Sequence, residues 1–170
     1  QLLSAKKILY VANINEDSLL GDNPQAAALA RLAATQGAEC IKLCGKIEAE
    51  LTELPPADRT EFLQSLGLSQ PGLHVLARAT YRLLGLQTFF TATPNESRAW
   101  TIPAGTSASA AAGKIHSDME RGFICAEVFR LEDLEQFGSE HDLRSAGKIR
   151  QEGREYVIQD GDVVFFKFNV

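Results

Sequence analysis

The 170-residue sequence predicts an α/β fold in its first half and an α+β fold in its second half. An apolar run at residues 8–12 and a second strand candidate at residues 38–44 flank an alanine-rich segment, which gives the order strand, helix, strand. From residue 86 the sequence changes to short runs of β-branched and aromatic residues separated by turn formers. These observations predict a βαβ unit with trailing helices, followed by a sheet-rich module.

The composition excludes several classes of protein. There are 17 Lys and Arg against 22 Asp and Glu, for a net charge of −5, and 45% of residues are hydrophobic, as in globular domains. No apolar run reaches the roughly 20 residues of a membrane span, and the start does not resemble a signal peptide. The acidic balance argues against binding nucleic acid by net charge alone. Three cysteines without a signal sequence favour a reducing, cytoplasmic setting.

The first predicted strand, residues 8–12, has the continuous apolar pattern of a buried strand in a parallel sheet. Asn23 and Pro24 then form a typical helix start, with Asn at the N-cap and Pro at the first helical position. Gly37 stands where a helix commonly ends in a glycine. A second strand follows at residues 38–44 and is stopped by the next glycine.

Two further helices complete the first half. A Pro-Pro-Ala-Asp sequence opens one that runs from residue 55 to about 66, and Pro71-Gly72 opens another that Gly85 closes. The second has a single apolar stripe at helical spacing. We therefore place the domain boundary by pattern, with domains at residues 1–84 and 85–170.

The second half has the element order of a ubiquitin-like β-grasp module. A hairpin is expected first, then a small-residue helix, a strand, one or two short helices and two closing strands. The corresponding segments are strands 88–93 and 98–102 with a turn at 94–96, helix 107–119, strand 123–129, helices within 131–147, and strands 156–159 and 163–168 around an Asp-Gly-Asp turn.

Two loops are candidates for a binding site. Asn13-Ile14-Asn15-Glu16 follows the first strand, and Cys44-Gly45-Lys46 ends its neighbour at the same sheet edge, where ligands of open α/β sheets bind. An Asn amide both donates and accepts hydrogen bonds, so it can read the edge of a purine, and a glycine allows close backbone approach. The alternative is that these are ordinary turn-forming residues.

Other chemistry has little support in the sequence. Residues 105–115 imitate a phosphate-binding loop, but Ala108 stands where that pattern requires Gly, and no other segment matches. The three histidines and three cysteines lack zinc-ligand spacing, and Cys40 and Cys44 are expected in the core. His116 with Ser117, Asp118 and Glu120 is better explained as a helix end. We assign no catalytic residue and no metal ligand.

Basic residues of the second half offer a possible RNA-binding face, with a mixed solvated surface as the alternative. They are Arg98, Lys114, Arg121, Arg144, Lys148, Arg150, Arg154 and Lys167. Phe166 and Phe168 share one strand face, so at least one aromatic ring is expected to be available to a partner.

Several long stretches resemble the YchF / Obg-like ATPase family and its C-terminal TGS domain. They are residues 98–106, 111–124 and 159–170, with 86–92 just before them. The likeness continues upstream through the βαβ segment and so covers nearly the whole chain. The resemblance implies that residues 1–84 are the C-terminal part of a P-loop G domain and that residues 85–170 are a TGS domain.

Members of this family are cytoplasmic, ribosome-associated NTPases that prefer ATP to GTP and use Mg²⁺. The resemblance implies that Asn13-Ile14-Asn15-Glu16 replaces the usual Asn-Lys-x-Asp guanine loop, with Asn13 contacting adenine and Ile14 packing or bonding nearby. Cys44 and Gly45 align with the last base-binding loop. Without the Asp, the acceptor for guanine's N1 and N2 hydrogens is lost, which gives a physical reason for altered base choice.

The family's phosphate-binding loop, switch regions and helical insertion lie N-terminal to these loops. The chain therefore resembles roughly the C-terminal half of a family protein, and alone it is expected not to hydrolyse ATP, because catalysis requires phosphate positioning and Mg²⁺. ATP, with GTP as the alternative nucleotide, and Mg²⁺ are expected as cofactors only with the missing N-terminal half of the G domain. Ribosome or ribosomal RNA is the expected partner of the TGS domain, and no membrane is expected. The alternative is a non-catalytic TGS docking module that binds RNA or ribosomal protein.

Overall fold

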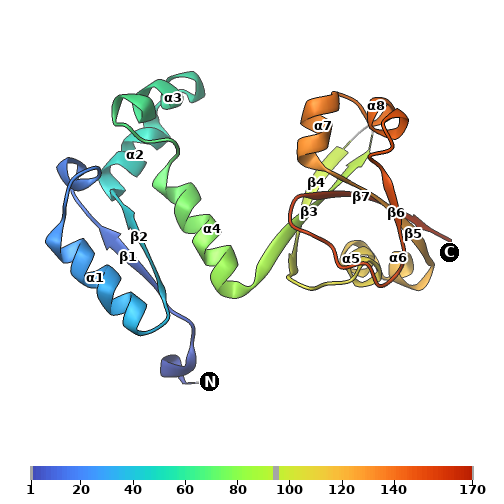
Figure 1. Ribbon diagram of the computed structural model, residues 1–170, viewed down its shortest axis with the longest axis horizontal. Helices are drawn as coiled ribbons and strands as arrows, with labels where there is room; N and C mark the ends of the chain where they lie inside the picture. The colour runs from blue at the N-terminus through green and yellow to red at the C-terminus, as the bar shows by residue number, and fades with distance from the viewer. Residues whose placement is uncertain (1, 94–95, 170) are drawn as a thin grey trace. The chain divides into compact units, whose positions relative to one another are not determined.

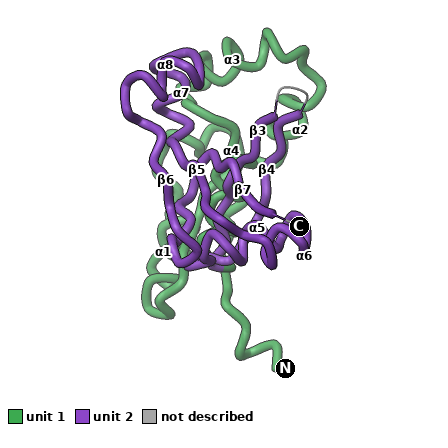
Figure 2. The backbone as a smooth tube through the Cα atoms, turned by 90° about the vertical axis from the view of Figure 1, so that its right-hand side faces the viewer, with its two compact units in different colours: residues 1–84 green, residues 85–170 purple. Residues whose placement is uncertain are grey.

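The computed structural model describes residues 2–93 and 96–169, and the chain forms two compact units, Gln1–Leu84 and Gly85–Val170 (Figures 1 and 2). Each unit is described by itself. Most of the turn predicted at 94–96 lies outside the described residues. Along the described chain, no helix is long and apolar enough to cross a membrane.

Unit 1 is built on a βαβ arrangement, as predicted. In its described residues β1 and β2 form a two-stranded parallel sheet, in register from the pair Leu9 and Glu39 to the pair Asn13 and Leu43. Its elements are η1 (Leu3–Ala5), β1 (Leu9–Asn13), η2 (Glu16–Ser18), α1 (Pro24–Thr35), β2 (Glu39–Leu43), α2 (Gly45–Glu53), α3 (Pro56–Ser65) and α4 (Gly72–Leu84).

Helices α1 and α4 both contact the strand pair and flank it in Figure 1. Helix α1 begins as the sequence predicts, because the Asn23 side chain accepts a hydrogen bond from the Ala26 N–H at 2.8 Å. It ends before Gly37, which has a φ of +64°, in the left-handed region that glycine enters without steric penalty. The predicted crossover between the two strands is confirmed.

Helix α2 corrects the expectation that Gly45 only ends a strand. The helix begins at Gly45 itself, and its N-cap Cys44 offers no side-chain hydrogen bond. It forms because Ile47 and Leu51 are buried against Leu63 of α3, so packing supplies what the missing cap signal does not.

Unit 2 is a β-grasp. Within residues 86–93 and 96–169 its five-stranded sheet has the order β4-β3-β7-β5-β6, with β3 and β7 parallel and the other neighbours antiparallel. Its elements are β3 (Leu86–Thr93), β4 (Glu96–Pro103), α5 (Ala108–Ile115), α6 (Ser117–Arg121), β5 (Phe123–Arg130), α7 (Leu131–Phe137), α8 (Glu140–Ser145), β6 (Arg150–Glu152) and β7 (Asp162–Phe168).

The sheet of unit 2 is covered on both faces. Alanines of α5 pack with Phe89, Ile102 and Val164 in the main core on one face. Residues of α7 and α8 pack with Phe129 and Val163 in a second cluster on the other. Phe166 is partly buried in the main core while Phe168 is 41% exposed, so one of these two rings is accessible, as expected.

Two expectations for unit 2 are wrong. Residues 156–159 are not a strand, because their backbone bonds to the loop before α5 and to its first turn: Ala108 N–H donates to the Tyr156 carbonyl at 2.7 Å, leaving only a bridge between Ser107 and Val157. The fifth strand is β6, a short polar segment. The helix predicted at 107–119 is interrupted at His116, which has extended backbone angles.

Candidate functional site

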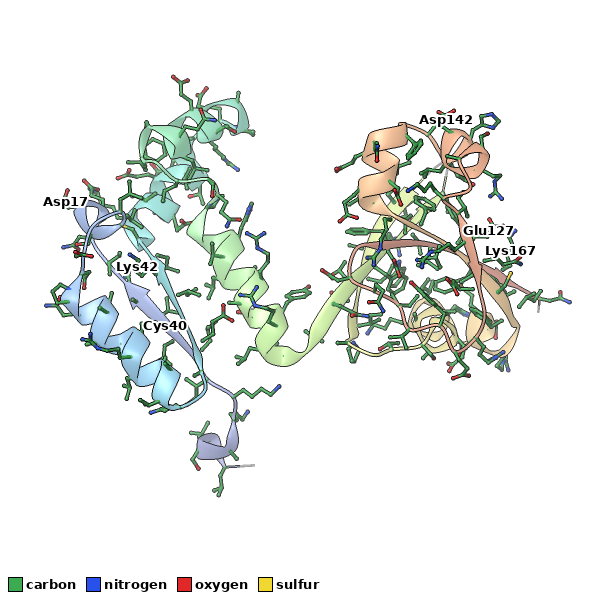
Figure 3. The ribbon with its side chains drawn as sticks, viewed as in Figure 1. Asp17, Cys40, Lys42, Glu127, Asp142 and Lys167 are labelled. Atoms are coloured by element: carbon green, nitrogen blue, oxygen red, sulfur yellow. The ribbon has the colours of Figure 1, made fainter. Side chains whose placement is uncertain are left out.

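The candidate site lies at the carboxyl ends of β1 and β2. Because the strands are parallel and Asn13 is level with Leu43, the segments that follow them begin side by side. The Ile14 N–H donates to the Leu43 carbonyl at 2.9 Å, which fixes the start of the first loop against the second. Figure 3 labels Asp17, whose η2 turn lies at this edge of the unit.

A pocket of about 360 Å³ opens between the two segments. Its lining residues are Asn13, Ile14, Asn15, Glu16, Asp17, Cys44 and Lys46. The structure therefore brings together four of the five residues that the sequence suggested, and the fifth, Gly45, is hydrogen-bonded to one of them. Asn15, Asp17 and Lys46 also line the pocket, although residue type and spacing alone predict no individual role for any of them.

Asn13 links the two segments. Its Oδ1 accepts a hydrogen bond from the Gly45 N–H at 3.0 Å, which orients the amide. The Nδ2 group therefore keeps donor capacity that it can direct to an acceptor in the pocket, such as a purine ring nitrogen. Ile14 is almost fully buried and packs with Ala12 and Ala26, so it forms a rigid apolar part of the lining.

Cys44 and Gly45 shape the pocket through the backbone. Cys44 is only 3% exposed and packs with Ile47 and Leu51, so the expectation that it is a core residue is confirmed. A Cβ on Gly45 would meet the Asn13 side chain at 3.4 Å, which is an ordinary contact. Sterics therefore do not require glycine at this position, and its contribution is the N–H that holds Asn13.

Glu16 and Lys46 form an ion pair at the pocket wall. Lys46 Nζ lies 2.8 Å from Glu16 Oε2 and 3.9 Å from Glu50 Oε1. The hydrogen bond with Glu16, followed by the charges of Glu16 and Glu50, raises the pKa of Lys46 above its ordinary value. The ammonium is thus fully charged at neutral pH, and the Glu16 carboxylate already has a partner.

Other candidates from the sequence have structural explanations. The Nδ1 of His116 accepts a hydrogen bond from the Asp118 N–H at 3.2 Å, which makes His116 the cap of α6. The segment that imitates a phosphate loop has Ala108, Ala111 and Ala112 fully buried in the core, so it has no free loop backbone for a phosphate. Cys40 is partly buried on β2, and no disulfide is formed among the three cysteines.

Most of the basic side chains that suggested an RNA face are paired with acids. The pairs are Arg98 with Glu96, Arg121 with Asp118, Arg144 with Glu127 and Glu140, Lys148 with Asp133, Arg150 with Glu152, and Lys167 with Glu127. Glu127, on β5, is only 13% exposed and has two cationic partners, Arg144 at 3.0 Å and Lys167 beside it in Figure 3. The hydrogen bonds from Arg144 and then Lys167 hold the pKa of Glu127 below its ordinary value, although burial acts in the opposite direction.

In residues 2–93 and 96–169 the structure assembles no group of three or more His, Cys, Asp or Glu side chains able to hold a metal ion. The pocket itself combines the oriented amide of Asn13 with the small exposed parts of Ile14 and Cys44.

Fold and site together define a class: the C-terminal part of an α/β G domain followed by a ubiquitin-like TGS domain. A family model named YchF-GTPase_C and described as "Protein of unknown function (DUF933)" matches residues 86–169. Two bacterial proteins called ribosome-binding ATPase YchF are similar over 99% of this chain: that of Haemophilus ducreyi is 48% identical, with 46% of its length covered, and that of Bacillus subtilis is 49% identical, with 47% covered. Human Obg-like ATPase 1 is 42% identical over 98% of this chain and 43% of its own length.

Solved structures show the same relationship. The Schizosaccharomyces pombe YchF GTPase superposes with a TM-score of 0.83 at 31% identity, covering 98% of this chain and 44% of that one. A GTP-binding protein from Pyrococcus horikoshii shares the fold with a TM-score of 0.64 at 18% identity, covering 95% and 45%. The chain belongs to the YchF / Obg-like ATPase family, and it spans about half the length of the curated relatives it matches, corresponding to their C-terminal half.

Proposed function

We propose that unit 1 binds the adenine base of ATP, in preference to the base of GTP, in the pocket at the ends of β1 and β2. The observation that carries the proposal is the oriented amide of Asn13, which is fixed through Oδ1 to Gly45 and has donor capacity left on Nδ2. A purine N7 is an acceptor that this donor matches. Ile14 offers an apolar surface for the ring, and Glu16 and Cys44 complete the wall.

In this proposal the chain supplies base recognition and other segments supply the phosphate chemistry. The sequence holds no phosphate-binding loop, and the described residues do not assemble a Mg²⁺ site. Hydrolysis depends on phosphate positioning and on metal-stabilised charge, so ATPase activity requires the N-terminal half of a G domain. The names of the relatives as ATPases support this assignment of the family activity.

We further propose that unit 2 is the docking module, with the ribosome as partner, in a cytoplasmic protein. Relatives named as ribosome-binding ATPases support the partner. The pairing of most basic side chains with acids disfavours docking by phosphate contacts alone. The alternative, a docking module without nucleotide chemistry, can be distinguished from this proposal because it predicts ribosome binding by a chain whose pocket binds no nucleotide base.

The base pocket can be tested on the chain itself by NMR titration with AMP and GMP. Nucleoside monophosphates place the base and ribose without needing the triphosphate-binding segments. AMP is expected to shift the amide signals of residues 13–17 and 44–46. Asn13→Ala should weaken AMP binding by about fivefold, the size of one lost hydrogen bond. Asn169→Ala, in unit 2, is the matched control and should have no effect. Shifts that avoid these amides, or an Asn13→Ala variant that binds AMP as well as the parent chain, would overturn the proposal.

A further inference from the structure

The Glu16 and Lys46 ion pair bears directly on which base the pocket accepts. Glu16 comes from the η2 turn after β1, and Lys46 from the first turn of α2 after β2. Their side chains meet at 2.8 Å across the pocket wall, and both residues line the pocket with Asn13. The pair therefore belongs to the base-binding surface as well as linking two segments.

Glu16 is the stronger partner of Lys46. The alternative carboxylate, Glu50, is one helical turn along α2 and 1.1 Å farther away, at 3.9 against 2.8 Å. The raised pKa of Lys46, caused first by the hydrogen bond with Glu16, is consistent with this preference. In the resting pocket Glu16 Oε2 is thus already occupied by a cationic donor.

The two purines differ in what they need from a carboxylate. Guanine presents the adjacent N1–H and N2–H donors, which are best bound by both oxygens of one free carboxylate. Adenine has an acceptor at N1 and a donor only at its N6 amino group, so it does not need such a two-oxygen acceptor. A carboxylate that already accepts a hydrogen bond from an ammonium group cannot offer both oxygens to the two donors of guanine. The same carboxylate costs adenine little, because adenine does not need those two acceptors.

We propose that Lys46 is a specificity-determining residue that disfavours guanine by occupying the Glu16 carboxylate. The inference rests on the proposed base pocket and adds a residue from outside the loop that carries Asn13 and Glu16. It assigns discrimination to an ion pair between two segments, so it depends on the side chain at position 46 as well as on the one at position 16.

The expected effect is modest because the pair is exposed. The side chains of Lys46 and Glu16 are 67% and 46% exposed, and exposed ion pairs contribute little because solvent screens them. Guanine would have to displace Lys46 from Glu16, so removing the ammonium should improve GMP binding relative to AMP by up to about fivefold.

The test measures AMP and GMP affinities by NMR titration of the full chain and of Lys46→Ala. Lys46 is exposed in the first turn of a helix and alanine is a good helix former, so folding should be retained. Lys46→Arg keeps a cation beside Glu16, and Glu50→Gln removes only the weaker partner, so both should keep the parent ratio of AMP to GMP affinity. Adding Glu16→Ala to Lys46→Ala should cancel the gain for GMP.

A ratio that shifts toward GMP in Lys46→Ala, and returns in the double variant, would support the proposal. A ratio that stays within the error of the parent value in Lys46→Ala would overturn it, as would the same shift in Glu50→Gln. These failures are distinct from failure of the base pocket, in which AMP would not perturb the amides of residues 13–17 in the parent chain.

Discussion

Replacing Glu127 by Gln should destabilise unit 2 in a pH-dependent manner. The carboxylate is 13% exposed and accepts hydrogen bonds from Arg144 and Lys167, whose own side chains are 54% and 52% exposed. Solvent therefore screens each of the two ion pairs, and their contribution is small for so buried a carboxylate. Loss of both should lower the free energy of unfolding by about 1 to 2 kcal/mol at neutral pH.

The pH dependence follows from the lowered pKa of Glu127 in the folded unit. In the unfolded chain this carboxyl titrates near its ordinary value of 4.5, and in the folded unit it releases its proton at lower pH. The stabilisation is therefore fully present above about pH 4.5 and is lost as the pH falls through the folded-state pKa. The stability gap between the parent chain and Glu127→Gln should be complete at neutral pH and close in acid.

Urea unfolding followed by tryptophan fluorescence measures this gap in unit 2 alone. Trp100 is the only tryptophan of the sequence. Its ring stacks near Phe89 with centroids 6.5 Å apart, and its Nε1 donates to Thr91 at 2.9 Å, so its emission reports the main core. Selective excitation avoids the three tyrosines.

A matched control is Glu152→Gln, which removes a carboxylate that has one partner, Arg150, at 3.6 Å. It should change the unfolding free energy by less than about 0.5 kcal/mol. The reasoning is refuted if Glu127→Gln is as stable as the parent chain at neutral pH. It is equally refuted if the gap keeps its full size at a pH well below 4.5.

Two further predictions concern packing and activity. Gly122→Ala should lower the free energy of unfolding of unit 2, measured by urea titration, by roughly 1 to 3 kcal/mol, because the new Cβ would lie 1.8 Å from the backbone oxygen of Asn169. A Cβ at Gly153 would meet no described atom within 4 Å, so Gly153→Ala should be nearly neutral, and equal effects of the two changes would contradict this reasoning. The chain alone should release no phosphate from ATP in a colorimetric assay, because it lacks the segments that position the phosphates. Phosphate release should appear when the N-terminal half of a relative such as the Bacillus subtilis protein is added, and should be lost when the phosphate-binding loop of that half is mutated. Turnover by the chain alone would contradict this prediction.

The sequence predicts those elements whose signals are local. The signals for the cap at Asn23, the glycine at 37 and the strands β1 and β2 depend on neighbouring residues only, and the structure has these features where expected. Helix α2 was missed because Cys44 provides no cap and its burial against α3 is a tertiary effect. Residues 156–159 have strand-forming side chains, but their backbone bonds to the region where α5 begins, which no local pattern reveals.

In the candidate site, too, some features follow from local sequence signals and others depend on tertiary contacts. That two loops meet at one edge follows from the parallel order of the strands, which the sequence pattern predicts. That Gly45 holds Asn13 at 3.0 Å, and that Lys46 meets Glu16 at 2.8 Å rather than relying on its helical neighbour Glu50 at 3.9 Å, depends on contacts between segments that are about 30 residues apart in the chain. Sequence spacing does not contain those distances.

The position of β7 constrains the order in which the two units can fold during synthesis. In unit 1 the paired strands are close in the chain, since Leu9 pairs with Glu39. In unit 2 the central strand, β7, is the last of the described strands to be synthesised. β3 and β5 are joined only through β7, so the pairing of Phe90 with Val163 cannot form until β7 has been made. Such non-local pairing slows folding, so a nascent chain should complete unit 1 while β3–β4 and β5–β6 are still separate strand pairs. Chains arrested before residue 162 would therefore expose the faces of both pairs to chaperones and proteases.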